Sequence, residues 1–144
     1  IFEDDEKIFY SAWRESLRPI RGLYHAYCTF CWAHFLFSDL TKSLLEGQKL
    51  NLSEEQTIKI YRRLLEEDTM LKCSEREMER AYELGKMSQA GYEVYRKFRD
   101  QILNAQATVE KAKQELSRQN LHELKKIDAL RERLEKQMRE AQKY

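Results

Sequence analysis

Four side chains of the types that bind metal ions or carry out thiol chemistry stand three residues apart near the N-terminus. They are His25, Cys28, Cys31 and His34, within the stretch YHAYCTFCWAHF. Cysteine and histidine are common ligands of zinc, and a Cys-x-x-Cys pair is typical of thiol–disulfide oxidoreductases. A metal protein or a thiol-redox protein that uses Cys28 and Cys31 is therefore one hypothesis for this chain.

The same spacing disfavours that hypothesis if the stretch is helical. Each step of three residues turns about 300° around a helix, so the four side chains together span about half of its circumference. A zinc ion needs its ligands within about 2.0–2.3 Å of one point. Cys28 also lies well inside the expected helix, whereas a reactive thiol commonly sits at a helix N-terminus that lowers its pKa. We expect Cys28 and Cys31 to be buried packing residues, and His25 and His34 to be hydrogen-bonded or at an interface.

Other motifs that indicate catalysis are missing from the sequence. It has no glycine-rich phosphate loop and no Gly-x-Ser-x-Gly segment, and its remaining cysteine and histidine, Cys73 and His122, stand alone. Acidic runs such as EEDT and EREMER are typical of solvated helix faces with ion pairs between neighbouring turns. The sequence therefore predicts a protein that is not an enzyme and needs no cofactor.

The composition predicts long helices in a reduced intracellular compartment. The 144 residues are 35% charged but include only four glycines and one proline, the residues that tight turns need. The formal net charge is +1 and no segment is a basic arm, so we expect no nucleic-acid-binding surface. Three cysteines are too few for a disulfide scaffold. The acidic opening IFEDDEK predicts no signal peptide, and because it does not begin with Met we expect it to continue a longer chain.

The sequence predicts two regions of an all-α protein. Residues 1–48 are expected to be an N-terminal helical docking segment, and residues 53–144 a long extended coiled-coil helix. Ser53 and Gln56 can form a capping box at the start of the second region. No proline follows, so we expect one helix almost to the C-terminus, with any bend or break in the segment GKMSQAG at 85–91.

The first region is expected to contain a short helix over residues 2–17 and a longer helix that starts at Pro19 and ends at Glu46, before Gly47. The longer helix has apolar or aromatic side chains on nearly every face, which is typical of a helix that is buried on all sides. Polar residues interrupt its apolar run, so we do not expect it to cross a membrane. The residues expected to dock on a partner are Tyr24, Tyr27, Phe30, Cys31, Trp32 and Phe35.

Apolar side chains in the second region follow each other at alternating spacings of three and four. This period of about 3.5 residues is typical of a coiled coil. The seam slips by one residue between Arg118 and Leu121, which we expect to change the winding of the coil without ending it. Two polar seam residues, Asn120 and Arg131, are expected to set its register or its choice of partner. The expected interface residues are Tyr95, Phe98, Ile102, Ala105, Val109, Ala112, Leu116, Leu124, Ile127, Leu134 and Met138.

A lone helix cannot cover such a seam, because burying a narrow stripe gains too little to offset the entropy of ordering the chain. The chain must therefore fold back at residues 85–91 or pair with another chain. We also expect a partner to cover the apolar faces of the N-terminal helix. The pattern leaves open whether a coil between chains is homomeric or heteromeric, and whether it is parallel or antiparallel.

Residues 61–134 resemble the THO complex subunit 7 family. The similarity lies in YRRLL at 61–65, Tyr82, GYEVYRKFRDQILNAQATVEKAKQEL at 91–116 and IDALRERL at 127–134, in the same order. The aromatic FCWAHF region is similar to an apolar helix of that family that contains Trp and Cys. The chain departs from the family in the loop GQKLNL, which resembles an insertion, and in Gly85 and Gly91, which interrupt a helical segment.

This resemblance implies a non-enzymatic scaffold subunit in the nucleus. Such subunits pair along their length with another coiled-coil subunit, THO complex subunit 5, in a THO/TREX assembly that couples transcription to mRNA processing and export. RNA and an RNA helicase are then partners of the whole assembly rather than of this chain, and no membrane is involved. A cytoplasmic coiled-coil tether or cytoskeletal adaptor stays open as an alternative, as does the metal or thiol-redox protein.

Overall fold

The structure, a computed structural model, describes residues 5–48 and 50–142. In this part of the chain five helices follow a short two-stranded hairpin, which confirms the predicted all-α class. The elements are β1 (Phe9–Ser11), β2 (Ser16–Arg18), α1 (Ile20–Leu45), α2 (Glu54–Glu83), α3 (Gln89–Asn104), α4 (Gln106–Gln119) and α5 (Leu121–Ala141).

The helix expected over residues 2–17 is wrong, because the described part of that segment forms the β1–β2 hairpin. Phe2, which was part of the expected helix, lies outside the described residues. The two strands are antiparallel, with Tyr10 opposite Leu17. The backbone N–H of Tyr10 donates a hydrogen bond to a carboxylate oxygen of Glu77 in α2, at 2.8 Å. Glu77 thus satisfies a backbone N–H of the hairpin from a helix that is far away in the sequence. The spacing of neighbouring residues does not reveal such an interaction.

The boundaries of α1 follow the expected local signals. The helix begins directly after Pro19, and its last residue is Leu45. Gly47 follows with φ of 79°, which confirms the predicted left-handed conformation. The backbone N–H of Gln48 then donates to the carbonyl oxygen of Ser43 at 3.0 Å, so the chain leaves the helix with that carbonyl satisfied.

The start of α2 is confirmed as a capping box, since Ser53 and Gln56 each accept from the backbone N–H of the other, at 3.1 and 2.9 Å. The helix does not run on to the C-terminus, because Gly85 adopts the left-handed conformation at φ of 72°. The hydroxyl of Ser88 then accepts from the N–H of Gly91 at 3.0 Å and starts α3. The segment 85–91 is therefore a full reversal of the chain.

A second reversal lies at Asn120, after α3 and α4 have run in succession with an interruption at Ala105. Asn120 has φ of −157° and ψ of 79°, so it leaves the helical conformation. Its side chain accepts from the backbone N–H of Glu123 at 3.3 Å and begins α5. The slip in the seam marks this turn, and the expectation of a coil that continues through it is wrong.

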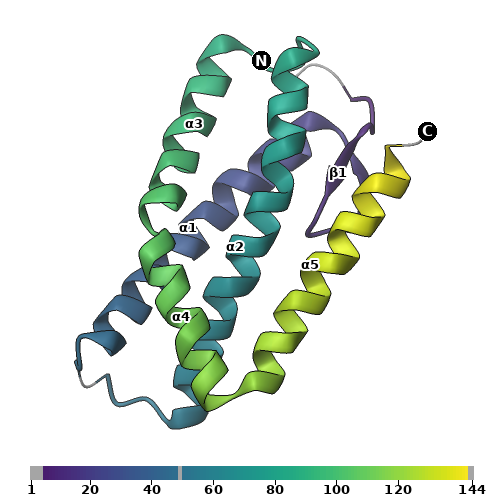
Figure 1. Ribbon diagram of the computed structural model, residues 1–144. Helices are drawn as coiled ribbons and strands as arrows, with labels where there is room; N and C mark the ends of the chain where they lie inside the picture. Colours follow the sequence, from purple (N-terminus) through teal and green to yellow (C-terminus); the bar gives the residue numbers. More distant parts are fainter. Residues whose placement is uncertain (1–4, 49, 143–144) are drawn as a thin grey trace.

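These reversals place the helices side by side in a bundle with α2 in its middle (Figure 1). α2 packs against α1, α4 and α5, and α3 packs against both α1 and α2. α5 returns along α2 on the side away from α3, and the described C-terminal end lies near the hairpin (Figure 1). The extended rod expected over residues 53–144 is thus folded into three antiparallel segments within one chain.

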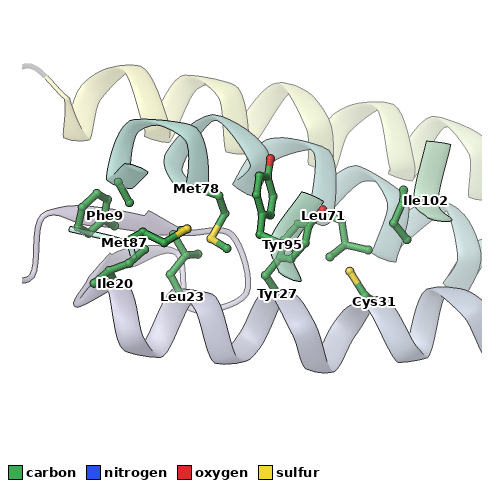
Figure 2. Close-up of a cluster of buried hydrophobic side chains, with 11 residues drawn as sticks. Phe9, Ile20, Leu23, Tyr27, Cys31, Leu71, Met78, Met87, Tyr95 and Ile102 are labelled. Carbon is green, nitrogen blue, oxygen red and sulfur yellow. The ribbon is translucent and has the colours of Figure 1, made fainter. Parts of the chain in front are cut away.

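The main core lies between the hairpin, α1, α2 and α3 (Figure 2). Tyr27 of α1 and Tyr95 of α3 are fully buried, and their rings meet edge to face with 5.2 Å between centroids. Leu71 and Met78 of α2 fill the space beside them. The labelled members of this cluster in Figure 2 are Phe9, Ile20, Leu23, Tyr27, Cys31, Leu71, Met78, Met87, Tyr95 and Ile102.

Candidate functional site

The four potential metal ligands of α1 do not converge. His25 is exposed and Cys28 is half-buried, whereas Cys31 and His34 are fully buried on the side that faces the bundle. Within residues 5–48 and 50–142, no group of three or more His, Cys, Asp or Glu side chains is placed to hold a metal ion. The helical spacing therefore separates these side chains as the geometry predicted.

The thiols of Cys28 and Cys31 are in surroundings that favour the neutral form. Burial raises the pKa of both thiols above the ordinary value. A nucleophilic or redox-active cysteine needs a lowered pKa, because the thiolate is the reactive species. Cys31 packs in the main core, as expected, and both cysteines are free.

His34 takes part in a buried polar node that joins α1, α2 and α4. Its Nε2 atom lies 3.0 Å from Oδ1 of Asp68, and the carboxylate can only accept, so Nε2 carries the proton. Gln106 donates to the same carboxylate oxygen at 2.9 Å. Lys72 lies 2.8 Å from the other carboxylate oxygen, Oδ2. Three helices are thus held in one register by a single carboxylate.

The ionised form of Asp68 is stabilised by these partners. Burial alone raises the pKa of a carboxyl group, but hydrogen bonds from His34, Lys72 and Gln106 together outweigh burial and lower the pKa of Asp68. Both oxygens of the carboxylate therefore have partners within the bundle. The node is therefore suited to fixing the fold rather than to binding a substrate.

Glu75 is the carboxyl group whose pKa is best suited to proton transfer. Burial raises its pKa from 4.5 to about 7, against the opposing effect of Arg99. The Tyr27 hydroxyl donates to it over 3.5 Å. Its cationic neighbours are held by other carboxylates, since Arg99 pairs with Glu79 at 2.9 Å and Lys72 pairs with Asp68. Glu75 is therefore a partly buried carboxyl group that accepts from the Tyr27 hydroxyl and is costly to ionise.

The residues expected along the coiled-coil seam are turned towards the inside of the single chain. Val109 and Leu116, for example, pack against Tyr61 and Leu65 of α2. The eight buried seam residues are Tyr95, Ile102, Val109, Ala112, Leu116, Ile127, Leu134 and Met138, and the half-buried ones are Phe98, Ala105 and Leu124. Of the two ways to cover the seam, folding back at residues 85–91 is the one that the chain uses. A contact with another chain through the buried residues would require the bundle to open.

The residues expected to dock the N-terminal helix divide into three groups. Tyr27 and Cys31 are fully buried in the main core. Tyr24 and Phe30 are partly covered within the chain, because the Tyr24 hydroxyl donates to the carbonyl oxygen of Gly91 at 2.8 Å and the Phe30 ring stacks on Trp13. Phe35 is half-buried against the main core, like Tyr24 and Phe30. Trp32 alone among the six expected docking residues is exposed.

Trp32 and Phe35 form an aromatic cluster with Phe98 of α3. The ring centroids of Trp32 lie 5.7 Å from those of Phe35 and 6.1 Å from those of Phe98, both edge to face. The two phenylalanine rings are stacked 6.2 Å apart. Trp32 is 66% exposed, the highest value among the exposed large hydrophobic residues. A tryptophan held in position by two rings and open to solvent is suited to contact with a protein surface.

Two exposed aliphatic residues extend this cluster. Leu36 is 56% exposed and lies one turn after Trp32 on α1, and Val94 is 44% exposed and lies one turn before Phe98 on α3. We call the set of Trp32, Phe35, Leu36, Val94 and Phe98 the α1–α3 aromatic surface. Other exposed leucines, such as those of the hairpin and the helix ends, are isolated and need no special explanation.

α1 carries fewer charged residues than α2. Of its 26 residues only Arg21, Asp39 and Lys42 are Asp, Glu, Lys or Arg, whereas α2 has fifteen such residues among 30. These three residues of α1 lie on its exposed side, together with His25, Thr29, Trp32 and Leu36. The apolar part of that side is therefore confined to Trp32 and Leu36, two large side chains that are open to water.

Sequence reasoning identified Trp32, Phe35 and Phe98 but missed Leu36 and Val94. Leu36 lies four residues after Trp32, and this helical spacing is the signal that could have found it. Val94 has no comparable signal, since it lies outside the heptad seam and reaches the surface only through the way α3 packs on α1.

Comparisons with family models, with curated proteins and with solved structures found no match to this chain. Among the described helices, none combines the length and the apolar character that crossing a membrane requires.

Proposed function

We propose that this chain is a non-enzymatic helical docking subunit of a multiprotein assembly, and that a partner binds to the α1–α3 aromatic surface. The observation on which this proposal depends is the exposure of Trp32, at 66%, beside two other aromatic rings. Residues of this kind contribute much of the binding energy at protein interfaces. The buried Asp68 carboxylate, in contrast, is engaged within the bundle by His34 and Gln106.

The chemistry of the surface indicates the kind of partner. It is apolar, it follows two adjacent helices, and α1 is nearly free of charge. A partner with closely spaced charges would lose their solvation here without gaining ion pairs. We therefore propose an amphipathic helix of another chain, which places a stripe of Leu, Met or Phe side chains over Trp32 and Leu36.

The identity of the assembly is proposed from the resemblance of residues 61–134 to the THO complex subunit 7 family. On that basis the assembly is nuclear and THO/TREX-like, the partner helix belongs to a THO complex subunit 5-like chain, and RNA and the helicase contact other subunits. The balanced charge of the chain is in keeping with this arrangement, because an RNA-binding subunit is expected to carry a basic patch. The docking contact lies on the aromatic surface, since the coiled-coil seam is covered inside the bundle.

The test is co-purification of the tagged full chain from cells, washed at high salt to weaken ionic contacts, with the bound proteins identified by mass spectrometry. A double variant, Trp32→Ala with Leu36→Asp, is compared with the parent. Loss of a tryptophan anchor is expected to cost about 2 kcal/mol of binding or more, a decrease in affinity of roughly 30-fold. The matched control is Leu103→Asp, because Leu103 is 53% exposed on α3 but lies outside the aromatic surface.

The supporting result is a THO complex subunit 5-like chain that the parent and the Leu103→Asp variant retain and the double variant loses. If the double variant retains the same partners as the parent, the aromatic surface is not the docking site. If the parent co-purifies with cytoskeletal or membrane-tether proteins and is found in the cytoplasm, the nuclear assembly is the wrong proposal.

A further inference from the structure

A hollow of about 480 Å³ lies between the β1–β2 hairpin and the first turns of α1. The hairpin lies beside the start of this helix (Figure 1). The lining includes Trp13, Arg14 and Arg18 from the hairpin and His25 and Phe30 from α1. Arg14 and His25 are exposed and the other three are half-buried, so all five side chains offer surface to the hollow. None of its described lining residues belongs to the α1–α3 aromatic surface.

The two arginines of the hollow have no counter-charge in it. Among the residues that the structure describes, no Asp or Glu belongs to the lining, and neither Arg14 nor Arg18 forms an ion pair. Glu15 follows Arg14 in the sequence, but its carboxylate pairs with Arg133 of α5 at 2.8 Å. Because a guanidinium group stays charged in proteins, the hollow has an excess of positive charge.

The other carboxylates close to the hollow are also engaged elsewhere. Asp5 pairs with Arg21 at 2.9 Å. Glu67 of α2 lies near Trp13, but its side chain is buried and pairs with Arg63 at 3.1 Å. The first turn of α1, which borders the hollow, contains no acidic residue. Within the described part of the chain, the two arginines of the hollow are therefore available to an anion from outside.

One wall of the hollow is aromatic. The rings of Trp13 and Phe30 are stacked, with 4.8 Å between their centroids and 9° between their planes. Both side chains are half-buried, so part of each ring stays open to the hollow. Gly22 and Ala26, one turn apart on α1, also line the hollow, and their small side chains take up little of its volume. An aromatic ring of a ligand can meet such rings edge to face.

We propose that this hollow binds a phosphate monoester carried on an aromatic ring, which is the chemistry of a phosphotyrosine side chain in a partner protein. The phosphate carries about 1.5–2 negative charges at about pH 7, which matches the two guanidinium groups of Arg14 and Arg18. Guanidinium groups bind phosphate oxygens through paired, charge-assisted hydrogen bonds. The ligand ring lies against Trp13 and Phe30. A cavity of about 150 Å³ holds benzene, so the hollow has room for a ring and a phosphate together.

The test is isothermal titration of the full chain with phenyl phosphate, phenyl sulfate and inorganic phosphate at about pH 7.5, where a phosphate monoester is mainly a dianion. Phenyl sulfate has the shape of phenyl phosphate but a single negative charge, and inorganic phosphate has the charge without the ring. Phenyl phosphate is expected to bind at one saturable site. Phenyl sulfate should bind about tenfold more weakly, and inorganic phosphate about fivefold more weakly.

Variants of the two arginines test the charge match. Arg14→Gln and Arg18→Gln are each expected to weaken the binding of phenyl phosphate roughly tenfold, because each removes a charge-assisted hydrogen bond. The matched control, Arg96→Gln with Arg139→Gln, changes two exposed arginines outside the hollow and is expected to leave the affinity unchanged. Circular dichroism of each variant shows whether the fold is kept. Arg14 is exposed in the turn of the hairpin, so its variant still decides the proposal if Arg18→Gln does not fold.

Tryptophan fluorescence locates the binding site. The chain has two tryptophans, Trp13 and Trp32, so in a Trp32→Phe variant the signal comes from Trp13 alone. This signal is expected to change with phenyl phosphate concentration along the same saturation curve as the heat of binding. A saturation curve without any change in Trp13 fluorescence would place the ligand elsewhere and contradict the proposal.

The source of the phosphate is tested with two further ligands, a short phosphotyrosine peptide and adenosine monophosphate. The peptide is expected to bind at least as tightly as phenyl phosphate, and the nucleotide more weakly. Tighter binding of the nucleotide would show that the hollow is a nucleotide site and not a phosphotyrosine site. Absence of saturable phenyl phosphate binding, equal affinities for phenyl phosphate and phenyl sulfate, or an unchanged affinity in the arginine variants would overturn the proposal.

Discussion

Replacing Glu75 by glutamine is expected to stabilise the protein in mildly alkaline solution and to leave its stability nearly unchanged in acid. Burial raises the pKa of Glu75 from 4.5 to about 7 in the folded protein. Between these two values the folded state binds a proton that the unfolded state does not bind, so stability must fall as the pH rises. Glutamine keeps an acceptor for the Tyr27 hydroxyl and never ionises.

The size of the effect follows from the two pKa values. Their difference, at about 1.36 kcal/mol for each pKa unit, corresponds to roughly 3.4 kcal/mol of folding free energy. The carboxyl group of Glu75 is only partly buried, so solvent screening reduces this figure to roughly 2 kcal/mol. For a chain of this length the melting temperature then rises by roughly 4–8 °C in the variant at about pH 8. At about pH 4 the difference between variant and parent is expected to vanish.

The assay is urea unfolding, followed by circular dichroism, of both proteins in steps from about pH 4 to about pH 8. The difference between variant and parent is the informative quantity, because contributions of other titrating groups, such as Glu67, largely cancel. Glu83→Gln, at an exposed position at the end of α2, is the matched control. A difference that does not depend on pH, or that favours the parent at alkaline pH, would refute the assignment of Glu75 as a carboxyl group that is costly to ionise.

Two further predictions concern the buried node and the seam. Asp68→Asn is expected to destabilise the protein by about 2–3 kcal/mol above about pH 4. The fold favours the ionised form of Asp68, so the stability that it contributes is present above the ordinary carboxyl pKa and is lost as the pH falls through the lowered pKa of the folded state. In denaturant titrations the difference in stability between parent and variant should therefore narrow below about pH 4. A difference that stays constant with pH would contradict the proposed role of charge. Ile102→Ala is expected to cost about 2–5 kcal/mol of stability because Ile102 is fully buried. Phe98→Ala changes a half-buried surface position, so it should cost clearly less stability and weaken partner binding instead. Equal losses of stability in thermal melts would show that Phe98 belongs to the core.

Local signals predicted where helices begin and end, but not how the helices associate. The capping box at Ser53 and the left-handed Gly47 were both predicted from neighbouring residues, because their interactions span only a few positions. The helix expected over residues 2–17 failed for the opposite reason. Its strand is held by Glu77, which is more than sixty residues away in the chain.

The α1–α3 aromatic surface was likewise predicted residue by residue but not as an assembled surface. Trp32, Phe35 and Phe98 were identified as docking or interface residues from composition and spacing alone, yet the sequence did not show that they meet one another. Their contact depends on α3 folding back beside α1. Leu36 and Val94 join them only in the folded chain, because exposure depends on which side of a helix its neighbours leave open.

The sequence by itself determined that this protein is helical, where its first long helices start, and that it carries an apolar stripe along residues 95–138 in need of a cover. Which surface covers that stripe was decided by the tertiary structure. A heptad pattern specifies an apolar face but is equally satisfied by another chain or by a helix of the same chain. The left-handed turn at Gly85 and the cap at Asn120 bring α2 against the stripe, and the burial of Val109, Leu116 and Leu134 follows from those two reversals.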